Sequence, residues 1–354
     1  HFCGTHFFNP PRYLRLLEII PTPFTDTAVV DFLMHYGDLY LGKTTVLTKD
    51  TPAFIANRVG VFGMMAIMKI MEKLQLSIDE IDALTGPLAG RPKSATFRTA
   101  DVVGIDTLIK VAKGVYDNCP NDEAKDIFNI PAWLNKMVEN NWLGDKTGQG
   151  FFKKVKTPDG KSDIQVLNLK TMEYTARQKP KFATLEAAKP IEDLPARLKI
   201  LINGTDKAGE FYRQFHYSLF SYISHRIPEI SDEVYRLDDA MMAGFGWEIG
   251  AFESWDASGV AKTTEAMKAA GFTVAKWVDD MLAAGHNTFY KVENGKRLYY
   301  DVAGKTYKNL PGGDTFLVMK YFTNQTIWKN SSSRVYHLGD DVLGLEWNTK
   351  MNSI

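Results

Sequence analysis

The residues best suited to chemistry lie at the start of the chain. His6 stands in the segment GTHFFNPP of residues 4–11, and Glu18 follows in an apolar run of residues 14–20. A strand, a proline-forced bend and a returning strand would bring Glu18 back beside His6. An ordinary histidine has a pKa of about 6.5, so it can accept and release a proton near neutrality, and a neighbouring carboxylate would fix its tautomer. The pair is therefore a candidate proton-transfer device, although a histidine at a strand end and a surface glutamate would have the same spacing.

Two further segments narrow the choice. In KDTPAFIANR, residues 49–58, Pro52 stands as at the first turn of a helix and Asn57 lies about a turn and a half further in. GDKTGQGFF follows at residues 144–152. Taken in this order, HFFNP with its downstream glutamate, KDTPAFIANR and GDKTGQGFF resemble the L-3-hydroxyacyl-CoA dehydrogenase family of fatty-acid β-oxidation.

The resemblance implies a role for four residues. In the family a histidine, here His6, takes the proton of the substrate's 3-hydroxyl while hydride passes from the same carbon to NAD. Glu18 matches the partner glutamate, and Asn57 matches an asparagine that holds the histidine and the substrate oxygen. Asn9 matches an asparagine that lines the substrate site. The implied cofactor is NAD, and the implied substrate is an acyl-CoA.

The main NAD-binding residues are not apparent in the sequence. The chain begins with His1 instead of methionine, and no strand, glycine-rich turn and helix that could hold a pyrophosphate precede His6. The segment GFGWEIG of residues 244–250 has the wrong glycine spacing, which favours a structural role. We therefore expect a fragment that starts at the last strands of a Rossmann domain and is inactive alone. A serine that the family uses ahead of its histidine would also lie outside the chain.

Composition excludes several classes of partner. Lys plus Arg and Asp plus Glu number 42 each, so no net field selects nucleic acid, and no apolar run reaches the roughly 20 residues of a membrane span. Only Cys3 and Cys119 are present, which suggests a reducing compartment, and we expect a cytoplasmic protein. The spacing of Cys3 and His6 is compatible with two ligands of one metal ion. Because no second pair of ligands follows, we assign no metal.

An internal repeat organises the rest of the sequence. The pattern F-x-x-x-D-x-x-G occurs at residues 97–104 and again at 252–259. Two helical modules of about 100 residues are expected to pack on each other, as in the tandem domains of multifunctional β-oxidation proteins, and the parent protein could form a homodimer. In the second copy, RIPEI at residues 226–230 is expected to replace the KDTPAFIANR helix start without its asparagine, and GHNTFY at 285–290 to replace GDKTGQGFF.

The predicted fold is mainly α, with tandem helical domains like the C-terminal domain of 6-phosphogluconate dehydrogenase and remnant Rossmann strands at the N-terminus. In order, we expect the end of a Rossmann domain (1–50), a first helical domain (51–155), a linker (156–195), a second, degenerate helical domain with a β-hairpin excursion (196–330) and the start of a crotonase-like domain (331–354).

The last of these regions rests on a short resemblance. Residues 333–348 alternate like two strands around Gly339-Asp340-Asp341 and, with residues 350–354, resemble the opening of an enoyl-CoA hydratase (crotonase) domain. The parent is therefore expected to be a hydratase as well. Two alternatives remain open. One is a dehydrogenase of a small hydroxy acid with a helical second domain, and the other is a non-catalytic dimerisation or scaffold module.

Overall fold

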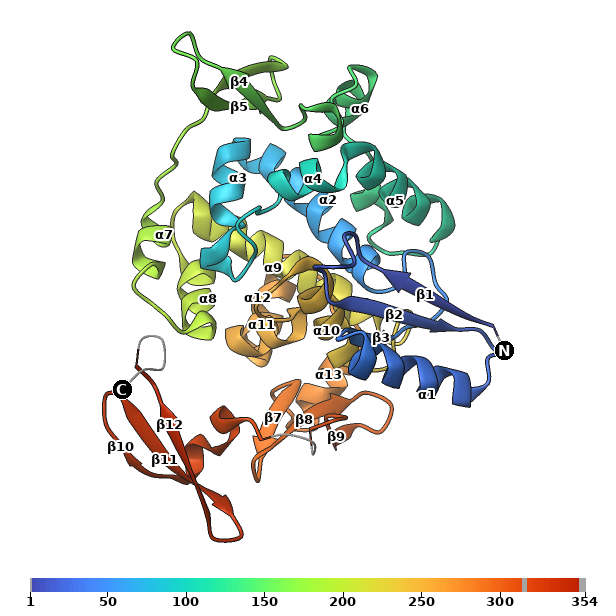
Figure 1. Cartoon of the computed structure of the whole chain (residues 1–354), viewed down its shortest axis with the longest axis vertical. Coiled ribbons are helices and arrows are strands. Elements are labelled where there is room, and N and C mark those ends of the chain that lie inside the picture. Colours follow the sequence, from blue (N-terminus) through green and yellow to red (C-terminus); the bar gives the residue numbers. More distant parts are fainter. Residues whose placement is uncertain (1, 314–316, 350–354) are drawn as a thin grey trace.

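The computed structural model describes residues 2–313 and 317–349 as helices with four three-stranded sheets at their periphery (Figure 1). The described chain is thus a mixed α/β structure. The expectation of a mainly α fold holds only for its central part, because each helical group is followed by a β-meander that covers its end.

The first sheet builds the N-terminal part. Strand β1 (Cys3–Phe7) runs antiparallel to β2 (Leu16–Pro21), and β3 (Thr44–Leu47) runs parallel to β2. Helix α1 (Thr27–His35) and a π turn (Tyr36–Tyr40) make the crossover between β2 and β3. Because β2 is central and also packs against a helix of the C-terminal half, its run LLEII is buried on both faces.

A first helical group follows the sheet. It comprises α2 (Ala56–Leu74), α3 (Ile78–Leu84), α4 (Phe97–Val103), α5 (Ile105–Asn118) and α6 (Ala132–Glu139), followed by β4 (Phe152–Lys156), β5 (Ser162–Asn168) and β6 (Glu173–Ala176). Short 3₁₀ turns lie at Pro87–Ala89, Lys125–Phe128 and Asp145–Thr147. Helix α2 is buried over most of its length, in agreement with its apolar sequence, and a capping box between Ser77 and Glu80 starts α3.

The second group starts with two additional helices and then follows the order of the first. It comprises α7 (Ala183–Ala188), α8 (Leu194–Asn203), α9 (Lys207–Arg226), α10 (Val234–Phe245), α11 (Ala251–Ser258), α12 (Val260–Ala269) and α13 (Lys276–Ala283), then β7 (Tyr290–Glu293), β8 (Lys296–Asp301) and β9 (Thr306–Asn309). From α9 to β9 this order parallels that from α2 to β6. Two expectations need correction. Arg226 ends α9 and residues 227–230 follow it without starting a helix, and residues 156–195, expected as a linker, contain β5, β6 and α7.

The two F-x-x-x-D-x-x-G elements make matching contacts. Asp101 accepts hydrogen bonds from the backbone amides of residues 151 and 152, at 2.8 and 2.9 Å. Asp256 accepts in the same way from residues 289 and 290, at 2.7 and 2.9 Å. Burial raises the pKa of Asp101 to about 6 and that of Asp256 to about 7. Each aspartate thus binds the start of the β-meander that follows its helical group. The domain boundaries expected from the sequence stay predictions.

The two helical groups are joined by aromatic stacking and by charge. The ring of Phe62 in α2 stacks on that of Tyr222 in α9, with centroids 3.7 Å apart. Beside them Arg58 donates to the Tyr222 hydroxyl at 2.6 Å and to Asp122 at 2.7 Å, and Asp122 also accepts from Arg226 at 2.8 Å. A buried carboxylate shared by two guanidinium groups therefore lies at the contact between the groups.

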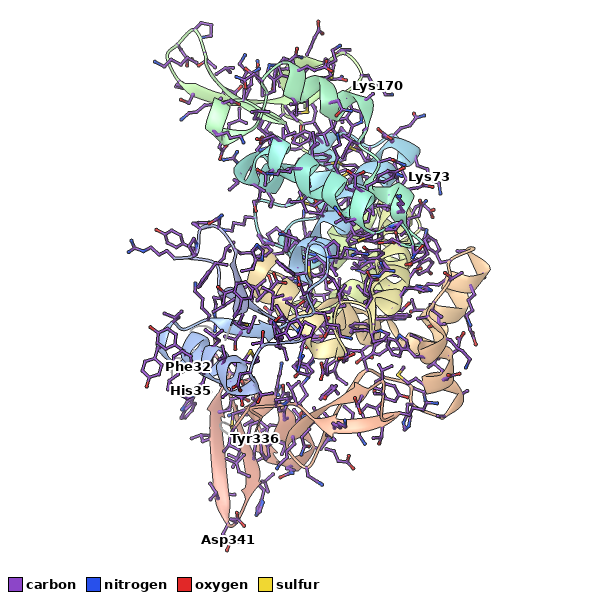
Figure 2. All side chains as sticks on the ribbon, turned by 90° about the vertical axis from the view of Figure 1, so that its right-hand side faces the viewer. Phe32, His35, Lys73, Lys170, Tyr336 and Asp341 are labelled. Atoms are coloured by element: carbon purple, nitrogen blue, oxygen red, sulfur yellow. The ribbon has the colours of Figure 1, made fainter. Side chains whose placement is uncertain are left out.

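The C-terminal sheet projects away from the helices (Figure 2). After a 3₁₀ turn (Met319–Gln325) it consists of β10 (Thr326–Lys329), β11 (Ser333–Gly339) and β12 (Val342–Trp347). The predicted turn is present, with Asp340 and Asp341 at φ 47° and 60°, and Figure 2 shows Asp341 at the tip. Residues 350–354, part of the crotonase resemblance, lie outside the described residues. Within the described ranges no helix is both long and apolar enough to span a bilayer.

Candidate active site

The structure brings His6 and Glu18 together. They face each other in the register of β1 and β2, and the His6 Nδ1 lies 2.7 Å from the Glu18 Oε2. The Glu18 side chain is fully buried, whereas that of His6 is 31% exposed. Because a carboxylate only accepts hydrogen bonds, Nδ1 carries the hydrogen and Nε2 keeps its lone pair. The neutral imidazole thus keeps a proton acceptor at Nε2, on a side chain that is partly exposed.

The second oxygen of Glu18 is also occupied. Its Oε1 accepts hydrogen bonds from the backbone amides of Ile55, at 3.0 Å, and Ala56, at 2.9 Å. These amides lie at the start of α2, where the helix dipole favours negative charge. A buried carboxylate thus holds three hydrogen-bond donors, one on the histidine and two on the helix.

The entry into α2 differs from the prediction. The helix begins at Ala56, so Pro52 lies in the preceding turn and not in the first turn of the helix. Ala53 and Phe54 have φ of 65° and 50°, a left-handed conformation that is uncommon for residues with a side chain. This conformation interrupts the helix, and the chain then presents the amides of residues 55 and 56 to Glu18.

The two predicted asparagines are placed differently. Asn57 is the second residue of α2, half-buried and next to the amides that bind Glu18. Asn9 is exposed in the bend between β1 and β2. The bend is held by Lys43, whose Nζ donates to the carbonyl oxygens of Pro11 and, at 2.8 Å, of Leu14. Neither asparagine hydrogen-bonds to His6 in the described part of the chain, so their roles toward substrate stay predictions.

Aromatic side chains pack around the histidine. The sequence alone did not indicate a role for them. The rings of Phe8 and Phe54 each lie 5.4 Å from the imidazole, centroid to centroid. Phe245, at the end of α10, contacts Phe8 at 5.5 Å. The second helical group therefore contributes a wall close to the site, which no motif in its sequence indicated.

The described residues do not hold a complete cofactor site. Residues 2–313 and 317–349 contain no strand, glycine-rich turn and helix that could bind a pyrophosphate, and the segment at 244–250 joins α10 to α11. Over the same ranges no cluster of three His, Cys, Asp or Glu residues could hold a metal ion.

A histidine oriented by a buried carboxylate, placed where a βαβ sheet meets a helical domain, forms a proton-transfer pair at the junction of the two parts. Comparison with known proteins gives the family. Residues 1–51 match the NAD binding domain of 3-hydroxyacyl-CoA dehydrogenases, and residues 54–154 match their C-terminal domain. The chain belongs to the 3-hydroxyacyl-CoA dehydrogenase family, whose nucleotide-binding domain indicates NAD as the cofactor.

Relatives cover the chain to different extents. A Bacillus subtilis protein named as a 3-hydroxyacyl-CoA dehydrogenase is 44% identical over the whole chain, and the chain spans 44% of its length. A Rickettsia felis protein named as a fatty acid oxidation complex trifunctional enzyme is 30% identical over 71% of the chain, which covers 34% of that protein.

A solved structure shares the fold. The 3-hydroxybutyryl-CoA dehydrogenase of Escherichia coli superposes with a TM-score of 0.52 over 80% of the chain and 71% of its own, at 17% identity. At this identity the similarity concerns the fold alone.

Proposed function

We propose that this chain supplies the proton acceptor and the helical domain of an NAD-dependent L-3-hydroxyacyl-CoA dehydrogenase. The observation that carries the proposal is the 2.7 Å contact between His6 and Glu18, with Glu18 anchored to the start of α2. Family membership supports the choice of an acyl-CoA thioester over a free hydroxy acid. A purely structural module would not require an accessible imidazole with its outer nitrogen free.

The reaction follows from the orientation of the imidazole. The substrate's 3-hydroxyl donates to the Nε2 of His6, which takes the proton as the C3–O bond becomes a carbonyl. A bound NAD would supply the acceptor for the hydride that leaves C3. Glu18 stabilises the imidazolium through Nδ1, and the walls formed by Phe8 and Phe54 limit the access of water. The products are the 3-oxoacyl thioester, reduced cofactor and a proton on His6.

The test uses a protein that joins these residues to a complete dinucleotide-binding domain. His6→Gln should lower kcat by roughly 100-fold or more while leaving the affinity for NAD nearly unchanged, because the base acts on the substrate hydroxyl. His225→Gln is a matched control, because this half-buried histidine lies in α9 outside the site. Near-normal turnover of 3-hydroxybutyryl-CoA by His6→Gln would refute the assignment. Faster turnover of free 3-hydroxybutyrate than of the thioester would favour a small hydroxy acid as substrate.

We also propose that the activity serves fatty-acid β-oxidation and is joined to an enoyl-CoA hydratase activity. The resemblance of residues 333–348 to the opening of a crotonase domain and the name of the Rickettsia felis relative support this proposal. Hydration of 2-enoyl-CoA by a protein in which a complete crotonase domain follows these residues is the direct assay.

A further inference from the structure

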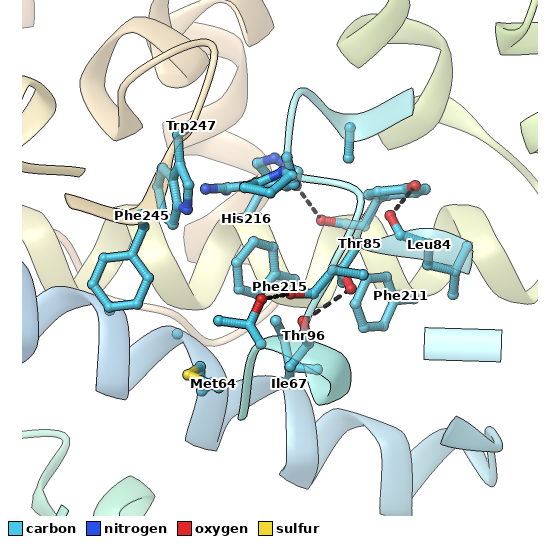
Figure 3. A pocket seen from close by; sticks show the side chains of 18 residues that line it. Met64, Ile67, Leu84, Thr85, Thr96, Phe211, Phe215, His216, Phe245 and Trp247 are labelled. Atoms are coloured by element: carbon cyan, nitrogen blue, oxygen red, sulfur yellow. Dashed lines mark hydrogen bonds between the residues drawn. The ribbon is translucent and has the colours of Figure 1, made fainter. Parts of the chain in front are cut away.

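A small cavity lies between the two helical groups, beyond the aromatic wall of the active site (Figure 3). It measures about 70 Å³ and is bounded by α2, by residues 84–99, by α9 and by the turn after α10. Figure 3 shows Phe245 and Trp247 on one side and Phe211 and Phe215 from α9 on another. Its volume exceeds the 10–15 Å³ or so that one water needs, so a group of several heavy atoms fits.

Arg91 lines this cavity without a partner of opposite charge. Its Nη1 is buried and makes no hydrogen bond, and among the described residues no carboxylate lies within ion-pair distance of its guanidinium. Burial lowers the pKa of Arg91 well below its usual value. The contrast with Arg58 is direct, because that buried guanidinium is paired with Asp122 and Glu229. An unsatisfied buried donor destabilises the folded chain, and a bound acceptor would recover that loss.

The surroundings orient the guanidinium toward a ligand. Its central carbon lies 3.0 Å from the centroid of the Trp247 ring. Stacking of this kind uses the face of the guanidinium and leaves its N–H groups free in the plane, where they can bind a carboxylate with two parallel hydrogen bonds. Arg91 is half-buried as a residue, so part of its side chain is open to solvent although Nη1 is not.

The other lining groups indicate the kind of anion. The hydroxyl of Thr96 donates to that of Thr85 at 2.9 Å, and His216 uses its Nδ1 on the carbonyl of Tyr212 at 2.8 Å. Since a carbonyl only accepts, the Nε2 of neutral His216 is not a donor. One guanidinium in a small, otherwise largely apolar cavity matches a single negative charge. It offers too few donors for a phosphate dianion.

We propose that this cavity binds a small carboxylate through Arg91. The carboxylate is that of a free acid or of the far end of a substrate's acyl chain, because Phe245 lines the cavity and contacts Phe8, whose ring in turn contacts the imidazole of His6. Both sources present the same group to the same guanidinium.

The test measures thermal unfolding of the chain in sodium butyrate, sodium phosphate and sodium chloride at equal ionic strength. Butyrate at about one hundred times its dissociation constant should raise the midpoint by about 4 °C relative to chloride. The rise should vanish in Arg91→Met and persist in Lys93→Met, a control that removes an exposed charge two residues away. Arg91→Lys should reduce the rise, and it serves as the second variant if Arg91→Met does not fold.

Three outcomes would overturn the proposal. These are no effect of butyrate beyond that of chloride, equal protection by phosphate, or protection that persists in Arg91→Met. Binding calorimetry with hexanoyl-CoA and adipoyl-CoA then distinguishes a free acid from the end of an acyl chain as the source of the carboxylate. Of the experiments described, only this calorimetry rests on the proposed acyl-CoA function. A preference for adipoyl-CoA that disappears in Arg91→Met assigns the cavity to the acyl chain, whereas equal binding of both thioesters assigns it to free acids.

Discussion

Replacing Glu18 with glutamine tests the active site at its buried end. The glutamine oxygen can still accept the amides of Ile55 and Ala56, but its amide nitrogen then faces the Nδ1 of His6 as a donor. To accept that hydrogen bond, the imidazole must carry its proton on Nε2 instead. The substitution therefore removes the lone pair that would receive the substrate proton, with almost no change in volume.

The size of the effect follows from the three contacts. Hydrogen bonds to a charged group contribute about 1 kcal/mol more than neutral ones, so weakening two amide bonds and the histidine bond should cost about 2–3 kcal/mol of folding stability. The chain should stay folded. Turnover, measured with a complete dinucleotide-binding domain attached, should fall by about 10²- to 10⁴-fold because the base has the wrong tautomer.

Nitrogen-15 NMR of the imidazole reads the tautomer directly in the chain itself. The wild type should show hydrogen on Nδ1 and the Glu18→Gln variant hydrogen on Nε2, whereas Glu139→Gln, an exposed exchange in α6, should leave the spectrum unchanged. An unchanged tautomer in Glu18→Gln, or turnover within a few-fold of the wild type, would refute the reasoning.

Three further substitutions test the packing. Asp122→Asn should cost about 3 kcal/mol in urea unfolding, because two buried guanidinium groups lose their shared carboxylate, whereas Asp145→Asn at an exposed ion pair should cost under about 1 kcal/mol. Gly60→Ala should cost about 1–3 kcal/mol, since its Cβ would lie 2.1 Å from an aromatic carbon, whereas Gly114→Ala, with open space around it, should stabilise by up to about 1 kcal/mol. Burial lowers the pKa of His216 from 6.5 to about 4, so between these values the unfolded chain binds a proton that the folded chain does not. The stability that neutral His216 contributes above pH 6.5 is lost as the pH falls to 4, and His216→Gln should remove about 3 kcal/mol of this acid dependence in unfolding at pH 7 and pH 4.

The sequence predicted features that depend on local chain geometry. Prolines after Phe8 forced the bend that sets His6 opposite Glu18, and the Gly-Asp-Asp turn near residue 340 set the last hairpin. The repeated F-x-x-x-D-x-x-G pattern marked two equivalent helices, because in each of them the aspartate accepts hydrogen bonds from the backbone at the start of the following β-meander. Such features need only nearby residues and their conformational preferences.

Other features depend on distant partners and left no local signal. Pro52 suggested a helix start, but Glu18 binds the amides of residues 55 and 56, and the chain before them adopts the left-handed conformation instead. Backbone amides carry no residue type that a motif could indicate. Pro228 suggested a second helix start, although it follows α9, and Arg91 stood out only once the packing of α2 against α9 showed that it lacks a carboxylate.

The shared use of Glu18 has a mechanical consequence. Its carboxylate hydrogen-bonds to His6 in the sheet and to the backbone amides at the start of α2. The imidazole is therefore aligned only while the sheet contacts that helix. A separation of about 1 Å would stretch both amide contacts beyond hydrogen-bonding range and free the carboxylate to turn away. Proton transfer by His6 therefore depends on contact between the sheet and the start of α2.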